Sequence, residues 1–196
     1  MSLLVALDVQ HIGKPSGSRP WLDRGAVSPA GWTEVDLTLA YTIAAERELQ
    51  RLGHHVVLLT DGTYRERWAR ADRYGADIYV ACHADAGGGD RGTVYHDYRS
   101  VGAEPTERGF GLAWAVARAL ADVVPWPIAA APLSPGVRGW VCISGVQAVA
   151  LLLEPGYVDG LALHEGRPHH RILWDRADAI GAALTRGIDE WARART

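Results

Sequence analysis

Three ionisable side chains lie where apolar runs of the sequence end. His11, His83 and Glu154 each follow directly or closely on a short apolar segment. The carboxyl ends of parallel strands meet at one edge of a sheet, and ligands bind at that edge in open α/β folds. If these segments are neighbouring parallel strands, the three side chains converge there. Glu34, in the first turn of a predicted helix, is placed to reach the same edge.

Two histidines and one carboxylate from separate elements are a typical ligand set for catalytic zinc. Three protein ligands leave a fourth position for water, and a carboxylate outside the metal site can accept the proton of that water. The hypothesis is that His11, Glu34 and His83 bind Zn²⁺ and that Glu154 is the general base.

Ordinary structural roles also explain these residues one at a time. A histidine at a strand end is more often a hydrogen-bonded loop residue than a ligand, and a glutamate in a first helical turn complements the helix dipole. Glu154 is harder to explain in this way, because a charge that ends a buried apolar run needs a partner or a raised pKa. The residue pattern alone therefore leaves a zinc site and unconnected polar residues both open.

Strand-like and helix-like segments alternate along the chain. Strands are predicted at 3–9, 55–60, 77–83, 92–98 and 147–154. Helices are predicted at 33–52, 64–75, 106–124 and 172–194. Residues 125–145, rich in Pro, Gly and Ala, are left unassigned. This order predicts a single α/β domain, with a twisted, mostly parallel sheet that is covered by helices on both faces.

Composition narrows the class of protein. Of the 196 residues 48% are hydrophobic, which suits one sizeable core. The formal net charge of -3 gives no electrostatic basis for binding nucleic acid or an anionic membrane. The N-terminal apolar run is too short to span a bilayer and lacks the features of a signal peptide. We therefore expect a product made in the cytoplasm, without an integral membrane segment.

The cysteines and the remaining histidines favour structural roles. Two cysteines are too few for a disulfide framework, and Cys82 is predicted to be a buried, unreactive thiol. His164, His169 and His170 lie in a polar segment and are interpreted as surface histidines rather than as a second metal site.

Several segments, in order, resemble the zinc-dependent N-acetylmuramoyl-L-alanine amidases, in the branch that includes bacterial cell-wall amidases and phage endolysins. They are LDVQHIG (7–13), DRGA (23–26), GWTEVD (31–36), RWARADRYGADIYVACHADA (67–86) and LLLEPGYV (151–158). The resemblance spans nearly the whole chain. It implies a mixed, twisted sheet of about six strands with helices on both sides.

The resemblance also implies an activity and a site. Its zinc ligands correspond to His11, Glu34 and His83, and its catalytic glutamate to Glu154. The family cleaves the amide between N-acetylmuramic acid and the L-alanine that opens the stem peptide of peptidoglycan. A glycine-poor VQHIG here replaces the family's Gly-His-Gly-Gly, and EPGY replaces its ELGF. Both departures bear on the shape of the substrate groove.

Further expectations concern residues around the site and the setting of the reaction. Asp85, Asp36 or Asp8 is expected to orient a ligand histidine, and Arg138 to contact a carboxylate of the stem peptide. We expect residues 1–196 to form one catalytic domain without a separate wall-binding domain, to act as a monomer, and to serve as a phage-type endolysin. A zinc peptidase and a non-catalytic wall-binding module are the alternatives.

Overall fold

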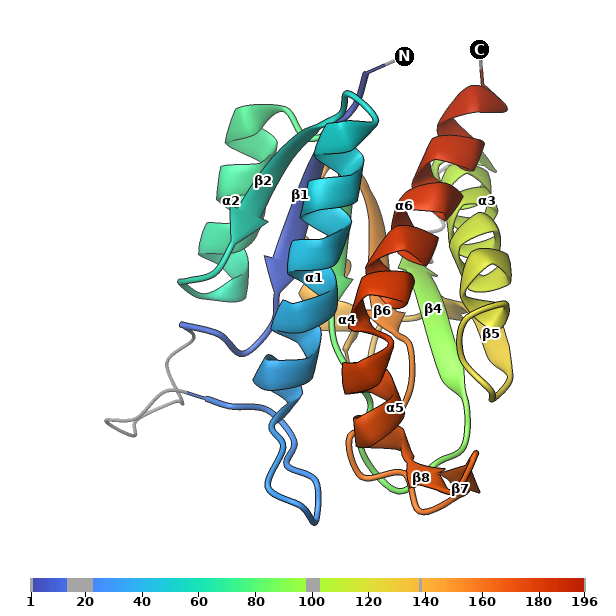
Figure 1. The fold of residues 1–196 in the computed structure, drawn as a ribbon. Helices are drawn as coiled ribbons and strands as arrows, with labels where there is room; N and C mark the ends of the chain where they lie inside the picture. The colour runs from blue at the N-terminus through green and yellow to red at the C-terminus, as the bar shows by residue number, and fades with distance from the viewer. Residues whose placement is uncertain (1, 14–22, 98–102, 138, 196) are drawn as a thin grey trace.

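A six-stranded mixed sheet forms the centre of the computed structural model (Figure 1). The structure describes residues 2–13, 23–97, 103–137 and 139–195, of which 103–108 are described only as backbone. The strands of the sheet are β1 (Leu4–Val9), β2 (His55–Leu59), β3 (Ile78–Cys82), β4 (Gly92–Asp97), β5 (Ile128–Leu133) and β6 (Val149–Glu154). Their order across the sheet is β2-β1-β3-β6-β4-β5.

The direction of the strands divides the sheet into two parts. β2, β1, β3 and β6 are parallel, whereas β4 pairs antiparallel with β6 and parallel with β5. The carboxyl ends of β1, β3 and β6 therefore lie side by side at the lower edge of the sheet in Figure 1. The predicted fold, a single α/β domain with a mostly parallel mixed sheet, is confirmed.

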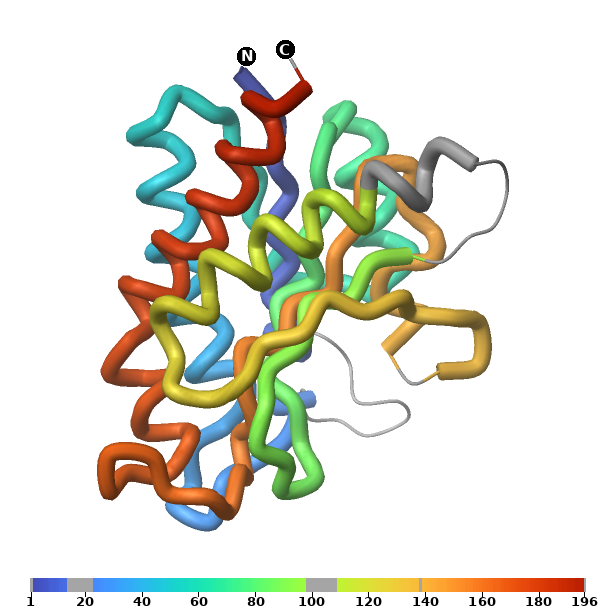
Figure 2. The backbone as a smooth tube through the Cα atoms, turned by 90° about the vertical axis from the view of Figure 1, so that its right-hand side faces the viewer, coloured from blue at the N-terminus to red at the C-terminus, as the bar shows by residue number. Residues whose placement is uncertain are grey.

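Helices cover both faces of the sheet. They are α1 (Glu34–Arg51), α2 (Tyr64–Tyr74), α3 (Ala103–Ala121), α4 (Trp140–Ile143), α5 (His169–Asp175) and α6 (Ala177–Arg193). On one face α6 packs between α1 and α3, and Figure 2 shows α3 beside α6 at the outer end of the sheet. α2 and α4 pack on the other face. A short hairpin of β7 (Leu163–His164) and β8 (Arg167–Pro168) lies near the lower edge.

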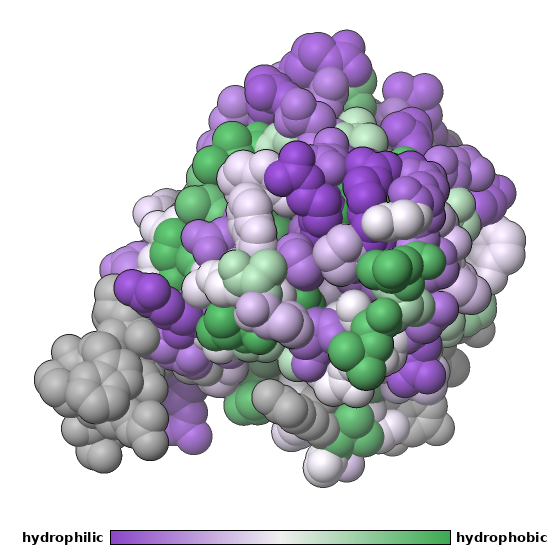
Figure 3. Space-filling view, turned by 60° about the horizontal axis from the view of Figure 1, so that its bottom comes forward, coloured by the Kyte–Doolittle hydropathy of each residue, from purple (hydrophilic) through white to green (hydrophobic). Residues whose placement is uncertain are grey.

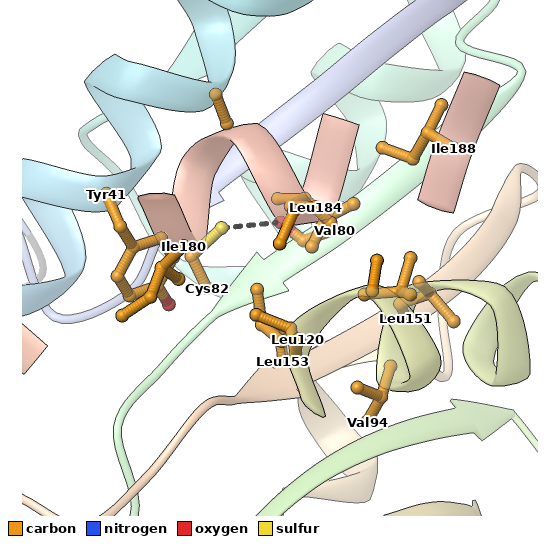
Figure 4. Packing of buried hydrophobic residues seen from close by; sticks show 14 of the residues in the cluster. Tyr41, Val80, Cys82, Val94, Leu120, Leu151, Leu153, Ile180, Leu184 and Ile188 are labelled. Carbon is orange, nitrogen blue, oxygen red and sulfur yellow. Dashed lines mark hydrogen bonds between the residues drawn. The ribbon is translucent and has the colours of Figure 1, made fainter. Parts of the chain in front are cut away.

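Alternation along the central strands supplies a core on each face. Figure 4 shows Val80 and Cys82 of β3 and Leu151 and Leu153 of β6 packed against α3 and α6. Leu152 points to the opposite face, toward α2 and α4. Each fully buried leucine stabilises the fold by about 1.5–3 kcal/mol relative to an exposed one. The apolar run of β6 thus anchors the strand that ends in Glu154.

Cys82 is the buried thiol that its position predicts. It is fully buried in the core, and burial raises the pKa of this thiol to about 12. A thiol with so high a pKa is almost entirely protonated at neutral pH, and is therefore a poor nucleophile.

The segment left unassigned by sequence contains two elements, β5 and α4. The predicted C-terminal helix 172–194 is in fact two helices that meet at Arg176, where the backbone leaves the helical region (φ -106°, ψ 14°). The Arg176 guanidinium donates to the carbonyl of Val123, at 2.6 Å, and this contact holds the junction against the end of α3. No helix in the described part of the chain combines the length and the apolar character needed to cross a membrane.

Candidate active site

Backbone pairing carries the sheet beyond the last residues of its central strands. The N–H of Gln10 donates to the carbonyl of Cys82 at 3.2 Å, and the N–H of His83 donates to that of Leu153 at 2.9 Å. His83 therefore extends β3 between the ends of β1 and β6. This continued register brings His11 and Glu154 to either side of His83, as the strand-end argument predicts.

α1 begins with a cap that sets the position of Glu34. Thr33 is the N-cap, and its hydroxyl accepts from the N–H of Asp36 at 3.2 Å. The Asp36 carboxylate accepts in turn from the N–H of Thr33 at 3.0 Å, which completes a capping box. Glu34 is thus the first residue of the helix, and its buried carboxylate reaches the ends of β1 and β3.

The carboxylate of Glu34 lies between two imidazoles. Oε1 is 2.8 Å from Nδ1 of His83, and Oε2 is 3.4 Å from Nε2 of His11. All three potential ligand atoms lie within 4.8 Å of one another. The two rings meet edge to face, with centroids 5.3 Å apart. Backbone N–H groups of Ala26 and Ala84 donate to the two carboxylate oxygens at 3.0 and 3.2 Å, which fixes the orientation of Glu34.

A glycine makes room for this cluster. Gly25 has a φ of +69°, and a Cβ at this position would collide with the Glu34 carboxylate and the His11 ring. His11 itself has a φ of +65°, an uncommon conformation for a residue with a side chain. This chain therefore holds the tight turn with a histidine, rather than a glycine, in the left-handed region.

His11 is held by an acidic side chain. Its Nδ1 is 2.7 Å from Oδ2 of Asp23, whose other oxygen accepts from the N–H of Gly25 at 2.9 Å. With the proton on Nδ1 donated to Asp23, the lone pair of Nε2 faces Glu34. Asp23 thus selects the tautomer in which His11 can bind a metal.

A buried ion pair supports the loop that carries His11. The guanidinium of Arg67, on α2, pairs with Asp8 and donates to the carbonyl of Val9 at 2.8 Å and to that of Ile12. Tyr79 and Gln10 also donate to Asp8. Arg67 and Asp8 are both fully buried. Arg67 therefore fixes the backbone on both sides of His11 without touching its ring.

A cleft of about 640 Å³ opens onto the cluster. Glu154 lines it together with His11, Glu34 and His83. The rest of the wall includes Asp85, Tyr64, Tyr95, Val137 and Val141. Figure 3 turns this edge of the sheet toward the viewer, where hydrophilic and hydrophobic side chains are interspersed. The cleft therefore offers both polar and apolar contacts to a ligand.

Comparison with known proteins identifies the family. The family model described as N-acetylmuramoyl-L-alanine amidase matches residues 5–163. The chain belongs to this family. The search of the curated proteins found no match to this chain. The family match confirms the resemblance predicted from the sequence, and the amidase is a hydrolase of peptidoglycan.

Solved structures share the fold of this amidase at low identity. The N-acetylmuramoyl-L-alanine amidase AmiC2 of Nostoc punctiforme has a TM-score of 0.75 at 22% identity, over 97% of each chain. The amidase Ami1 of Mycobacterium smegmatis has a TM-score of 0.79 at 18% identity, over 98% of this chain and 97% of that one. The catalytic domain of the CD27L endolysin, which targets Clostridium difficile, has a TM-score of 0.70 at 15% identity, over 96% and 97%.

Burial and neighbouring groups shift the pKa values of two residues of the amidase site in opposite directions. Burial opposes ionisation of Glu34, but interactions with His11 and His83 outweigh burial and lower the pKa of this carboxyl. Burial likewise opposes protonation of His83, but Cys142 and Glu34 together raise the pKa of this imidazole to about 10. Glu34 is therefore ionised at neutral pH, and His83 holds a proton that a metal ion at this site would displace.

The acidic residues proposed to orient a histidine have other contacts in the amidase. Asp36 belongs to the capping box, and Asp8 pairs with Arg67. Asp85 lines the cleft, and its Oδ1 accepts from the N–H of Ala86 at 2.7 Å. Arg138 lies outside the described residues.

Sequence reasoning missed Asp23 and Arg67 as individual residues. Both fall within segments that carry the family resemblance, DRGA and RWARADRYGADIYVACHADA. The polar character of these two residues, within segments that carry the resemblance, was the sequence signal that could have identified them. The contacts that give each its role are long-range, from a loop to His11 and from α2 to β1.

Proposed function

We propose that the amidase is zinc-dependent and that His11, Glu34 and His83 hold the metal. The observation that carries the proposal is the convergence of two imidazole nitrogens and one carboxylate oxygen within 4.8 Å, from three separate elements. Zn²⁺ commonly takes these donor types, and three protein ligands are typical of a catalytic site. The lowered pKa of Glu34, which keeps this carboxylate ionised, supports the same assignment.

Glu154 is the proposed general base. When bound, zinc supplies a Lewis acid that polarises the scissile carbonyl and makes water a better nucleophile at neutral pH. The Glu154 carboxylate accepts the proton that the attacking water loses, and then delivers it to the nitrogen of the departing L-alanine. Asp23 keeps the proton of His11 on Nδ1 throughout, and the backbone N–H groups of Ala26 and Ala84 keep Glu34 in place.

The proposed bond is the amide between the lactyl group of N-acetylmuramic acid and L-alanine. The test is the metal content of the purified protein, together with mass spectrometry of the fragments that it releases from peptidoglycan. We expect free stem peptides that begin with L-alanine, and their loss on chelation. His83→Ala should remove the activity together with the zinc bound at His11, Glu34 and His83.

Two results would overturn this proposal in different ways. Activity that persists in protein free of metal would exclude the zinc mechanism. Fragments cut within the stem peptide, with muramic acid still attached to L-alanine, would identify the alternative, a zinc peptidase.

Asp23→Asn tests whether Asp23 prepares His11 to bind zinc. Asparagine keeps the size of the side chain but loses the charge that stabilises the Nδ1 proton of His11. We expect zinc affinity to fall about 10–100-fold, because outer partners of ligand histidines typically have effects of this size. Competition with a chromophoric chelator measures the affinity. Asp61→Asn, on the exposed carboxylate that pairs with Arg70, is the matched control and should leave affinity unchanged.

The setting that we propose is lysis of the cell wall by a monomer of phage-endolysin type, made in the cytoplasm. Its support is the fold shared with the catalytic domain of the CD27L endolysin. The genes that flank the coding sequence distinguish this setting from a bacterial amidase of wall remodelling.

A further inference from the structure

A second cluster of potential metal ligands lies apart from the catalytic residues. Asp90 precedes β4, His164 ends β7, and His169 begins α5. Oδ1 of Asp90 is 2.5 Å from Nε2 of His164 and 3.0 Å from Nε2 of His169. The three potential ligand atoms lie within 4.8 Å of one another, as in the first cluster.

The inner histidine of this cluster is built into the fold. The side chain of His169 is fully buried, contrary to the expectation of surface histidines for this segment, and His170 is buried as well. The His169 ring stacks on Trp126 with centroids 3.9 Å apart and planes 8° from parallel. Gly160 leaves room for the ring, because a Cβ at this position would collide with it. These contacts fix the direction in which Nε2 of His169 points.

We infer that Asp90, His164 and His169 form a second, structural binding site for a divalent transition metal such as Zn²⁺. Two imidazole nitrogens and a carboxylate oxygen favour zinc or a similar ion over Mg²⁺ or Ca²⁺, which prefer oxygen ligands. Asp90 is 49% exposed and His164 21%, so an ion and the water that completes its coordination have access.

The alternative is that hydrogen bonds alone, without a metal, hold Asp90, His164 and His169 together. The N–H of Tyr157 lies 3.5 Å from Nδ1 of His169, which favours the tautomer with the proton on Nε2. Metal binding must move that proton to Nδ1 and so breaks the hydrogen bond from Tyr157. At 3.5 Å this hydrogen bond is weak, whereas His169 gains a coordinate bond to a metal ion in its place.

An ion at this place would join three segments next to the catalytic cleft. Asp90 belongs to the loop that leaves the strand end of His83, and His164 belongs to the β7–β8 hairpin. Trp126, stacked on His169, donates through Nε1 to the carbonyl of Pro155 at 2.7 Å, and Pro155 follows Glu154. The second metal would therefore stiffen the backbone beside the proposed base without contacting the substrate.

The stoichiometry of Zn²⁺ in the wild type and five variants tests the inference. Equilibrium dialysis against buffered zinc followed by elemental analysis should give two equivalents for the wild type. We expect one equivalent for His164→Ala and one for His83→Ala, but none for the double variant. Asp90→Ala should repeat the His164→Ala result, and His55→Ala, at an exposed histidine, should retain both equivalents. Circular dichroism in chelator shows whether each variant is folded.

The failure of this inference and the failure of the proposed function have different signatures. One equivalent in the wild type, lost in His83→Ala and unchanged in folded His164→Ala and Asp90→Ala, would overturn the second site and leave the zinc amidase intact. One equivalent that persists in His83→Ala and disappears in His164→Ala would support the second site and contradict the catalytic one.

Discussion

Glu154→Gln should reduce hydrolysis of purified peptidoglycan by roughly 10²–10⁴-fold, the usual contribution of a general base. Glutamine keeps the size of the side chain at the end of β6 but cannot accept a proton from water. Because Glu154 lines the cleft outside the His11–Glu34–His83 cluster, we expect the zinc content and the melting temperature to stay at the wild-type values. The measurement is the initial rate of stem-peptide release with zinc content determined on the same sample.

A matched glutamate separates this effect from a general loss of charge. Glu46 lies on α1 and accepts an exposed hydrogen bond from Gln50, so Glu46→Gln should hydrolyse peptidoglycan at the wild-type rate. If Glu154→Gln keeps wild-type turnover while carrying a full complement of zinc, another group accepts the proton. If it loses zinc, Glu154 acts as a ligand instead.

The parts of the site that the sequence predicts are those that follow from the sheet. Apolar runs mark β1, β3 and β6, and parallel strands in register must bring their ends together. His83 needs only this regularity to be placed. Asp23 is different, because it reaches His11 from a segment with no periodic pattern, and only the folded loop brings the two together.

The hydrophobic periodicity of α1 predicts its buried face less well. Val35, Leu39 and Ile43 share a face of α1 and predict its apolar side, but Ile43 is 46% exposed. The buried face instead carries Leu37, Tyr41 and several small residues, because α6 packs closely on α1. At Gly181 of α6 an added Cβ would collide with the backbone of α1. Close packing of small residues thus replaces a stripe of large ones.

The histidines of the C-terminal segment show a second limit. A run such as HEGRPHH is polar, and polar segments usually lie at the surface. His169 is buried because Trp126, far away in the sequence, offers an aromatic face to stack on. The burial of a polar ring by a distant partner leaves no local signal.

Arg67→Met should destabilise the amidase by about 3–5 kcal/mol, the typical cost of removing one member of a buried ion pair. Methionine preserves much of the apolar volume of the arginine side chain but leaves Asp8, which is fully buried, without its cationic partner. The carbonyls of Val9 and Ile12 lose their donor as well. Equilibrium unfolding in urea measures the change as a fall in the free energy of unfolding.

Arg67→Met should also weaken zinc binding, because Arg67 holds the backbone on both sides of His11. His11 keeps a φ of +65° between two carbonyls that Arg67 holds, so removal of the guanidinium frees this turn. We expect zinc affinity to fall together with stability. Arg65→Ala, at an exposed position on the same helix, should change the free energy of unfolding by no more than about 0.5 kcal/mol.

Asp8→Asn combined with Arg67→Met distinguishes the loss of an interaction from the burial of an unpaired charge. With both charges removed, the large penalty for an unpaired buried carboxylate disappears, and the double variant should be more stable than Arg67→Met alone. A double variant that is no more stable would mean that the lost carbonyl contacts of Arg67, rather than an unpaired charge on Asp8, account for the fall in stability.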